Sequence, residues 1–204
     1  RPATPDGGST VMKILMTTMK LDIGGAETHI VELCGELRRR GYEIVVASNG
    51  GVYVKELERQ GIRHVKLPLH TKRISSVIRS YFGLKKLIKA EGFDIVHAHA
   101  RIPAFICGAL SKKLGFRFMT SAHWVFKVNP VWKMIADWGE RSVAVSYDIK
   151  QYLIDNYGVC SDNISVTING IDTEKFSAET DATPFISELG LDRSARRVVC
   201  VSRI

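Results

Sequence analysis

The chain has 204 residues, of which 45% are hydrophobic, and a formal net charge of +8. This length and composition suit a folded domain with its own core and exclude a disordered chain, and no apolar run approaches the roughly 18 residues of a membrane-spanning helix. The positive charge leaves an anionic substrate and an anionic membrane as partners. We expect no nucleic acid partner, because the basic residues form no continuous tail and no aromatic-basic signature of an RNA-binding sheet is present.

Residues 1–11 are small, polar and rich in Pro and Gly, and they lack the apolar core of a signal peptide. We expect a flexible leader there, with Met12 as the natural start. Four cysteines are widely spread and lack the spacing of zinc ligands. Each lies in an apolar stretch, which predicts buried free thiols and a cytoplasmic location. These cysteines are Cys34, Cys107, Cys160 and Cys200.

Short apolar runs alternate with segments whose apolar residues recur every three or four positions. We expect strands at 11–18, 43–48, 63–67, 93–98, 116–121, 142–146, 164–168 and 198–201. We expect helices at 26–40, 52–60, 74–90, 102–114 and 147–157, with a further short helix in the loop before 142. This alternation predicts an α/β fold with a doubly wound, mostly parallel Rossmann-like sheet. Ligands of such sheets bind outside the carboxyl ends of the strands, so the residues that directly follow strands are the candidates.

After the first expected strand, Gly24 and Gly25 open a helix. Glycines let a ligand approach the backbone, and the free N–H groups of a helix N-terminus favour an anion. The segment lacks the three-glycine dinucleotide fingerprint and the phosphate-binding Lys-Ser/Thr pair. A tight turn without any ligand explains the two glycines equally well.

Three histidines lie at the carboxyl ends of strands in the middle of the chain, and His99 is a candidate substrate-binding residue. His97 and His99 are two residues apart on one strand, so both imidazoles face the same side. A hydrogen-bonded pair is expected rather than a metal site, because no Asp/Glu–His spacing supplies further ligands. His123 follows the next strand, where it either meets a substrate or serves in packing. Farther on, Asn169 and Gly170 favour a turn with positive φ.

The helix expected at 74–90 carries two different faces. Its core face is expected to comprise Ile74, Val77, Ile78, Tyr81 and Ile88. A basic stripe with one aromatic residue lies on the face turned from the core: Arg79, Phe82, Lys86 and Lys89. This stripe is either a solvated face or a contact with an anionic membrane surface. A second aromatic-basic cluster follows His123 and supports the membrane alternative: Trp124, Phe126, Lys127, Trp132 and Lys133.

Taken together and in order, the segments 24–48, 93–123, 143–159, 164–176 and 198–204 resemble family 4 of the retaining glycosyltransferases. The resemblance covers nearly all of 12–204. It implies the GT-B fold, in which two Rossmann-like domains face each other across a cleft. By this resemblance the chain comprises an acceptor-side domain at 12–176, a linker region at 177–195 and the first strand of a donor-binding domain at 196–204.

The resemblance also assigns roles to single residues. Gly24 and Gly25 match the glycine loop near the donor diphosphate and the transferred sugar, and His123 matches the histidine that contacts that sugar. Asn169 and Gly170 match a turn close to the cleft. Arg203 matches the arginine that holds the donor diphosphate, a task suited to its forked, permanent charge. The family's second-domain lysine and its two glutamates seven residues apart have no counterpart in the sequence.

The activity so implied is transfer of a sugar, with retention, from a nucleoside-diphosphate sugar to an acceptor hydroxyl on a glycan or a lipid-linked molecule. The setting would be cell-envelope, exopolysaccharide or glycolipid synthesis, at the cytoplasmic face of the inner membrane. We expect no metal or other cofactor, and an inactive chain in the absence of a donor-binding domain. The alternatives are a non-catalytic module that binds glycan or lipid, and a nicotinamide-dependent oxidoreductase. The latter is disfavoured because the second strand ends in Ala47-Ser48-Asn49 without an acidic residue.

Overall fold

The structure is a computed structural model that describes residues 11–171, 173, 177, 179–192, 196, 198 and 200. Contacts divide the chain into two units, one through Asn169 and one from Gly170 onward. The first unit holds the whole sheet. Its strands are β1 (Lys13–Thr17), β2 (Glu43–Ser48), β3 (Arg63–Lys66), β4 (Ile95–Ala98), β5 (Arg117–Ala122), β6 (Arg141–Ala144) and β7 (Ile164–Val166). Its helices are α1 (Gly25–Arg39), α2 (Val54–Arg59), α3 (Ile74–Glu91), α4 (Arg101–Leu114), α5 (Pro130–Ile135), α6 (Tyr147–Tyr157) and the 3₁₀ turn η1 (Ser161–Asn163).

The seven strands form one parallel sheet in the order β3-β2-β1-β4-β5-β6-β7. The predicted doubly wound α/β fold is therefore confirmed. β1 is an interior strand, where Met16 is paired with Val46 of β2 on one side and with His97 of β4 on the other. The chain winds outward in one direction from β1 and in the other from β4, so the boundary between these strands is the switch point at which such sheets bind ligands.

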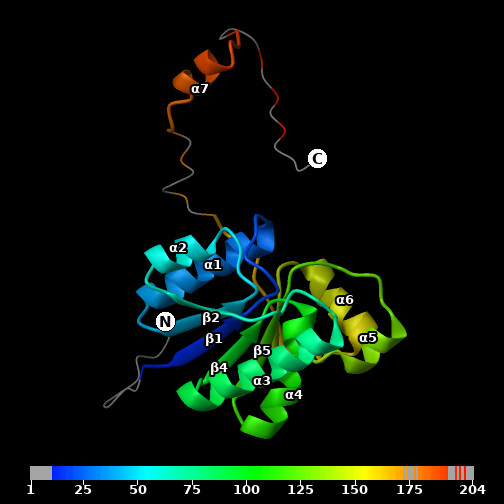
Figure 1. The fold of residues 1–204 in the computed structure, drawn as a ribbon. Helices are drawn as coiled ribbons and strands as arrows, with labels where there is room; N and C mark the ends of the chain where they lie inside the picture. Colours follow the sequence, from blue (N-terminus) through cyan, green and yellow to red (C-terminus); the bar gives the residue numbers. More distant parts are fainter. Residues whose placement is uncertain are drawn as a thin grey trace. The chain divides into compact units, whose positions relative to one another are not determined.

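Helices cover the sheet on both faces, because alternate side chains of each strand point to opposite sides (Figure 1). On one face, Ile14 and Met16 of β1 pack with Ile30 and Cys34 of α1, and α2 joins the same cluster. On the other face, the cluster around Leu15 extends into α3 and α4. A third cluster lies beneath α6 on strands β5, β6 and β7.

The ends of α6 show why local sequence predicts its bounds so well. The hydroxyl of Ser146 accepts a hydrogen bond from the backbone N–H of Ile149, at 3.2 Å, and so caps the N-terminus. Gly158 ends the helix with a φ of 67°, which only glycine adopts without a steric cost.

The core face predicted for α3 is wrong at two positions. Ile74 is 79% exposed and Ile78 is 51% exposed, whereas Leu84 and Ile88 are buried against the sheet and α4. Successive helical residues turn by about 100°, so the row through the partly buried Val77 and the buried Leu84 and Ile88 leaves Ile78 rotated toward solvent. The consequence is that two large apolar side chains join Phe82 on the outside of α3.

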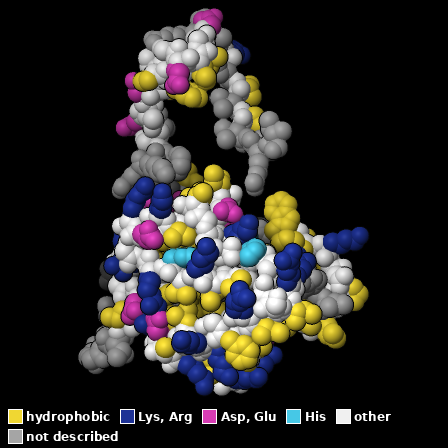
Figure 2. All heavy atoms as spheres, in the orientation of Figure 1, with side chains coloured by type: hydrophobic (Ala, Val, Ile, Leu, Met, Phe, Trp, Pro, Cys, Tyr) yellow, Lys and Arg dark blue, Asp and Glu magenta, His cyan; other side chains and the backbone are white. Residues whose placement is uncertain are grey.

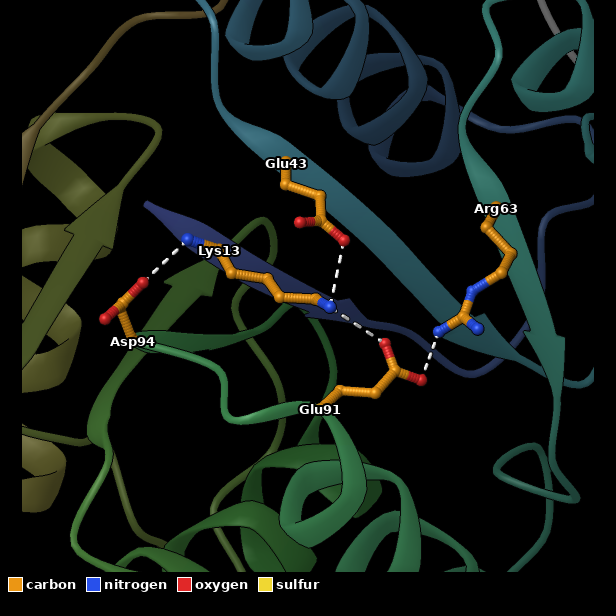
Figure 3. A network of polar contacts seen from close by, with 5 residues as sticks. All are labelled: Lys13, Glu43, Arg63, Glu91 and Asp94. Carbon is orange, nitrogen blue, oxygen red and sulfur yellow. Dashed lines mark hydrogen bonds and ion pairs between the residues drawn. The ribbon is translucent and has the colours of Figure 1, made fainter. Parts of the chain in front are cut away.

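A polar network joins the amino ends of the first strands, at the edge opposite the switch point (Figure 3). The Lys13 ammonium lies 2.9 Å from Glu43 and 3.2 Å from Glu91, and the Lys13 backbone N–H donates to Asp94 at 2.7 Å. Glu91 also pairs with Arg63. The hydrogen bond with Glu43 is the largest contribution that raises the pKa of Lys13. The network ties the start of the sheet to the end of α3.

Two further outcomes concern the cysteines and the second unit. Cys34 and Cys107 are buried as predicted, and burial raises the pKa of each thiol to about 12. Cys160 and Cys200 are exposed, so the prediction is wrong for them; Cys160 lies at the surface just before η1. In the second unit α7 (Thr183–Glu188) falls within the segment interpreted as a linker. The strand expected at 198–201 falls partly outside the described residues.

Candidate active site

The loops that follow β1, β4 and β5 lie next to one another, because these three strands are neighbours in the sheet. They enclose a cavity of about 430 Å³. Its wall includes Met19 and Glu27 after β1, His99 and Arg101 after β4, and His123 after β5. The cavity therefore opens at the carboxyl edge of the sheet beside the switch point, where the fold predicts a ligand.

Four imidazoles form one cluster, and two of them, His99 and His123, line this cavity. The rings of His97 and His99 lie 4.1 Å apart, which confirms that they face the same side. His97 Nε2 is hydrogen-bonded to Ser121 Oγ at 2.8 Å, and His99 Nδ1 is hydrogen-bonded to His123 Nε2 at 3.1 Å. The ring of His29, from the first turns of α1, lies 5.3 Å from that of His123. His29 could not be assigned to the site from the sequence, since only the packing of α1 on the sheet brings it here.

These imidazoles are neutral near pH 7. Burial, together with the repulsion that charged His123 and His29 would exert, lowers the pKa of His97 to about 3. Burial and a charged His29 lower the pKa of His123 to about 4, and burial also lowers the pKa values of His99 and His29. A neutral imidazole offers one donor and one acceptor, so this cluster can hydrogen-bond to hydroxyl groups without carrying a charge.

Two nitrogens of the cluster are buried and unpartnered among the described residues: Nε2 of His99 and Nδ1 of His123. His99 itself is only 6% exposed. Buried polar atoms in folded proteins nearly always have a partner, so an orphaned pair at a cavity wall is a place where a ligand completes the hydrogen bonding.

Aromatic side chains and Arg101 form the outer wall of the cavity. The Arg101 guanidinium lies 4.0 Å from the centre of the Phe126 ring, in cation–π contact. The Tyr152 hydroxyl donates to the Phe126 backbone carbonyl at 2.9 Å and so holds this loop. Trp124 is 70% exposed, and Trp138 lines the cavity. Sequence reasoning missed Arg101, Ser121 and Trp138, although Arg101 lies close behind the strand expected at 93–98.

Gly24 and Gly25 lie at the N-terminus of α1, as expected, but Ala26 and Glu27 line the cavity instead. Neither glycine has a positive φ, since Gly24 is extended at 179°. A Cβ on Gly24 would meet the Glu27 carboxylate, whereas a Cβ on Gly25 would meet open space. The backbone conformation therefore does not require glycine here. Whether these residues admit a ligand stays a prediction.

The expected turn at Asn169 and Gly170 is wrong, because neither of these two described residues lies in the left-handed region. β7 already ends at Val166, so the chain has left the sheet before Asn169. Both residues are exposed. Arg203 lies outside the described residues. Over the part of the chain that the structure covers, no group of three or more His, Cys, Asp or Glu side chains could hold a metal ion.

An open parallel sheet with a cavity at its switch point defines a ligand-binding α/β domain. The chain belongs to Glycosyltransferase Family 4, whose family model matches residues 23–175.

Three similar proteins illustrate the relationship. The D-inositol 3-phosphate glycosyltransferase of Frankia alni is 23% identical over 214 residues, covering 90% of this chain and 52% of that protein. A glycosyltransferase structure from Rickettsia africae has a TM-score of 0.78 at 23% identity, over 91% of this chain and 51% of the other. Anabaena HepE, solved with UDP-glucose, has a TM-score of 0.72 at 16% identity, over 88% of this chain and 50% of that one. The chain thus spans about half the length of the relatives it matches.

Proposed function

We propose that this chain is the acceptor-side half of an enzyme that transfers a sugar from a nucleoside-diphosphate sugar to an acceptor hydroxyl. The observation that carries the proposal is the cavity at the switch point, with His123 and His99 in its wall and unpartnered nitrogens on both. Family membership and the relative solved with UDP-glucose support a nucleotide-sugar donor. In these relatives the matched region is about half of the protein. We propose that a second half completes the donor pocket.

The chemistry proposed for this half is positioning. Neutral imidazoles at His123 and His99 form hydrogen bonds with sugar hydroxyls, as donors or as acceptors. They do so without the positive charge of a protonated histidine. The free N–H groups at the start of α1, after Gly24 and Gly25, face the developing charge of the diphosphate leaving group. The acceptor oxygen then bonds to the anomeric carbon on the face from which the diphosphate departs, so the configuration is retained. The bond between that carbon and the diphosphate breaks, and the departing diphosphate takes the acceptor proton, without a protein nucleophile or a metal. Catalysis comes from orientation and from stabilisation of the leaving group.

The test uses a full-length form that joins this chain to a donor-binding half, assayed against a panel of nucleoside-diphosphate hexoses. His123→Ala is expected to lower kcat at least tenfold, about 1.4 kcal/mol of transition-state stabilisation. A variant that loses thermal stability but keeps kcat would return His123 to a packing role. The 204-residue chain alone is expected to unfold cooperatively and to turn over none of the donors, so measurable transfer by this chain would contradict the proposal.

We further propose that α3 contacts an anionic membrane surface, which suits a lipid-linked acceptor. Ile74, Ile78 and Phe82 recur every four residues and are 79%, 51% and 60% exposed. They form an apolar row on the outside of the helix. The exposed basic side chains of Arg79, Lys86 and Lys89 flank it. Figure 2 shows basic and hydrophobic side chains interspersed over this part of the molecule. No helix among the described residues is long and apolar enough to cross a bilayer.

Each Lys or Arg near an anionic surface contributes about 1 kcal/mol, so three such residues give weak, salt-sensitive binding. Co-sedimentation with vesicles that contain phosphatidylserine, at low and high salt, measures it. We expect the chain to bind at low salt. Changing Arg79, Lys86 and Lys89 together to Glu should abolish this binding. Phe82→Ser, a matched change of the apolar row, should weaken binding at both salt concentrations. If the triple variant and the unchanged chain bind equally well, the membrane proposal is contradicted and the basic stripe is only a solvated helix face.

A further inference from the structure

The hydrogen bond between His99 Nδ1 and His123 Nε2 constrains the protons of both rings. The two atoms lie 3.1 Å apart, and both imidazoles are neutral near pH 7. One of the two atoms must carry the proton and the other must offer its lone pair. Since each neutral ring has a single N–H, the choice at this bond also fixes what the outer nitrogen of each ring presents.

Only two arrangements satisfy this bond. If His99 Nδ1 donates, His99 Nε2 is a bare acceptor and the proton of His123 lies on Nδ1. If His123 Nε2 donates, the proton of His99 lies on Nε2 and His123 Nδ1 is a bare acceptor. In both arrangements the two rings have the same tautomer, protonated either both on Nδ1 or both on Nε2. A mixed pair would bring two protons or two lone pairs face to face.

Both outer nitrogens are buried, so the arrangements are distinguished by the exposure of the two side chains as a whole. The outer nitrogens, His99 Nε2 and His123 Nδ1, are unpartnered among the described residues, and in each arrangement one of them carries an N–H. Orphaned buried N–H groups are rarer in proteins than under-satisfied acceptors. His99 is 6% exposed, whereas His123 is only partly buried in the cavity wall. The N–H is therefore better placed on His123, where a ligand oxygen can accept from it.

We propose that His99 is a positioning residue that holds His123 in the Nδ1–H tautomer, so that His123 presents a hydrogen-bond donor to a ligand oxygen. The donor is selective for groups with an oxygen lone pair, such as a sugar hydroxyl or a phosphoryl oxygen. The identity of that oxygen as part of the transferred sugar rests on the proposed function. The tautomers themselves do not depend on it.

Long-range ¹H–¹⁵N correlation spectra of the ¹⁵N-labelled chain at pH 7.5 report which nitrogen of each histidine is protonated. The expected result is that His99 and His123 are both protonated on Nδ1. Protonation of His123 on Nε2, or different tautomers for the two rings, overturns the proposal. Because this measurement needs only the unaltered chain, it holds even if every variant at His99 fails to fold.

Two variants separate positioning from general packing. His99→Phe keeps a ring in place but removes the hydrogen bond, and it should convert His123 into a mixture of tautomers. Ser121→Ala removes the neighbouring bond to His97 and should leave the tautomer of His123 unchanged. A single unchanged tautomer in His99→Phe, or a mixture in Ser121→Ala, contradicts the role of His99. The tautomers could also behave as expected while His99→Phe leaves kcat of the full-length enzyme unchanged. That result would contradict the proposed role of His123 in sugar transfer, but not the positioning role of His99.

Discussion

The imidazole cluster should make folding sensitive to mild acid. The pKa of His97 is about 3 and that of His123 is about 4 in the folded chain, against about 6.5 when unfolded. A histidine whose folded pKa is lowered binds fewer protons than in the unfolded state. Its contribution to stability is therefore complete above pH 6.5 and is lost as the pH falls from there toward the folded pKa.

Between pH 7 and pH 5 each of these two histidines lowers the free energy of unfolding by about 2 kcal/mol. The unfolded state is favoured over about 1.4 pH units of this range, at about 1.36 kcal/mol per unit. The two together remove about 4 kcal/mol, and His99 adds to the loss in the same direction. For a chain of this size the urea slope is about 2 kcal/mol/M, so the unfolding midpoint should fall by about 2 M.

Urea titrations followed by circular dichroism at pH 7 and pH 5, at matched ionic strength, measure this shift. His97→Gln should reduce the shift by about 1 M, because the amide does not titrate. Ser121→Ala is the matched control, since it removes the same hydrogen bond but keeps the imidazole; it should lower the midpoint equally at both pH values. A midpoint that moves by less than about 0.5 M, or an unchanged shift in His97→Gln, would refute the reasoning.

Three further results are expected. Glu91→Gln should destabilise the chain by about 1 kcal/mol at pH 7, because it weakens the contacts with Lys13 and Arg63. Burial raises the pKa of Glu91, but these contacts outweigh burial and lower the pKa overall. In denaturant titrations the destabilisation should therefore shrink as the pH falls through that lowered pKa. Gly139→Ala should lower Tm more than Gly158→Ala, since both have positive φ but only a Cβ at Gly139 would meet the backbone of Phe118; equal Tm values would contradict this. In the full-length enzyme, EDTA should leave sugar transfer unchanged, and loss of activity restored by added Mg²⁺ or Mn²⁺ would reverse the expectation of a metal-free reaction.

The strand–helix alternation predicted the fold because most strands are short apolar runs and nearly every helix has a clear apolar period. Capping residues such as Ser146 and Gly158 made the bounds of α6 readable from local sequence. The predicted face of α3 failed where packing decides, since Ile74 and Ile78 fit the helical period as well as the residues that are buried. Periodicity identifies an apolar face but does not determine which part of it the neighbouring elements cover.

The candidate site was predicted in part. His99 and His123 could be found because they follow neighbouring strands and alternate residues of a strand share a side. Their direct contact could not be found, since it depends on β4 and β5 being paired in one register, with His97 opposite Met119. His29 is 68 residues from His97 in sequence (97 − 29) and joins the cluster only because α1 packs against the sheet.

The interior position of β1 in the sheet has a consequence for synthesis of the chain. Ile14 is paired with Ile95 of β4, 81 residues later (95 − 14), so one edge of β1 stays open until β4 has left the ribosome. At about 5–20 residues per second, that interval lasts about 4–16 s. During it β1, β2 and β3 form a sheet whose apolar edge strand can pair with other chains. Chains truncated before β4 should therefore aggregate in cell-free translation, whereas chains extended past β5 should remain in solution.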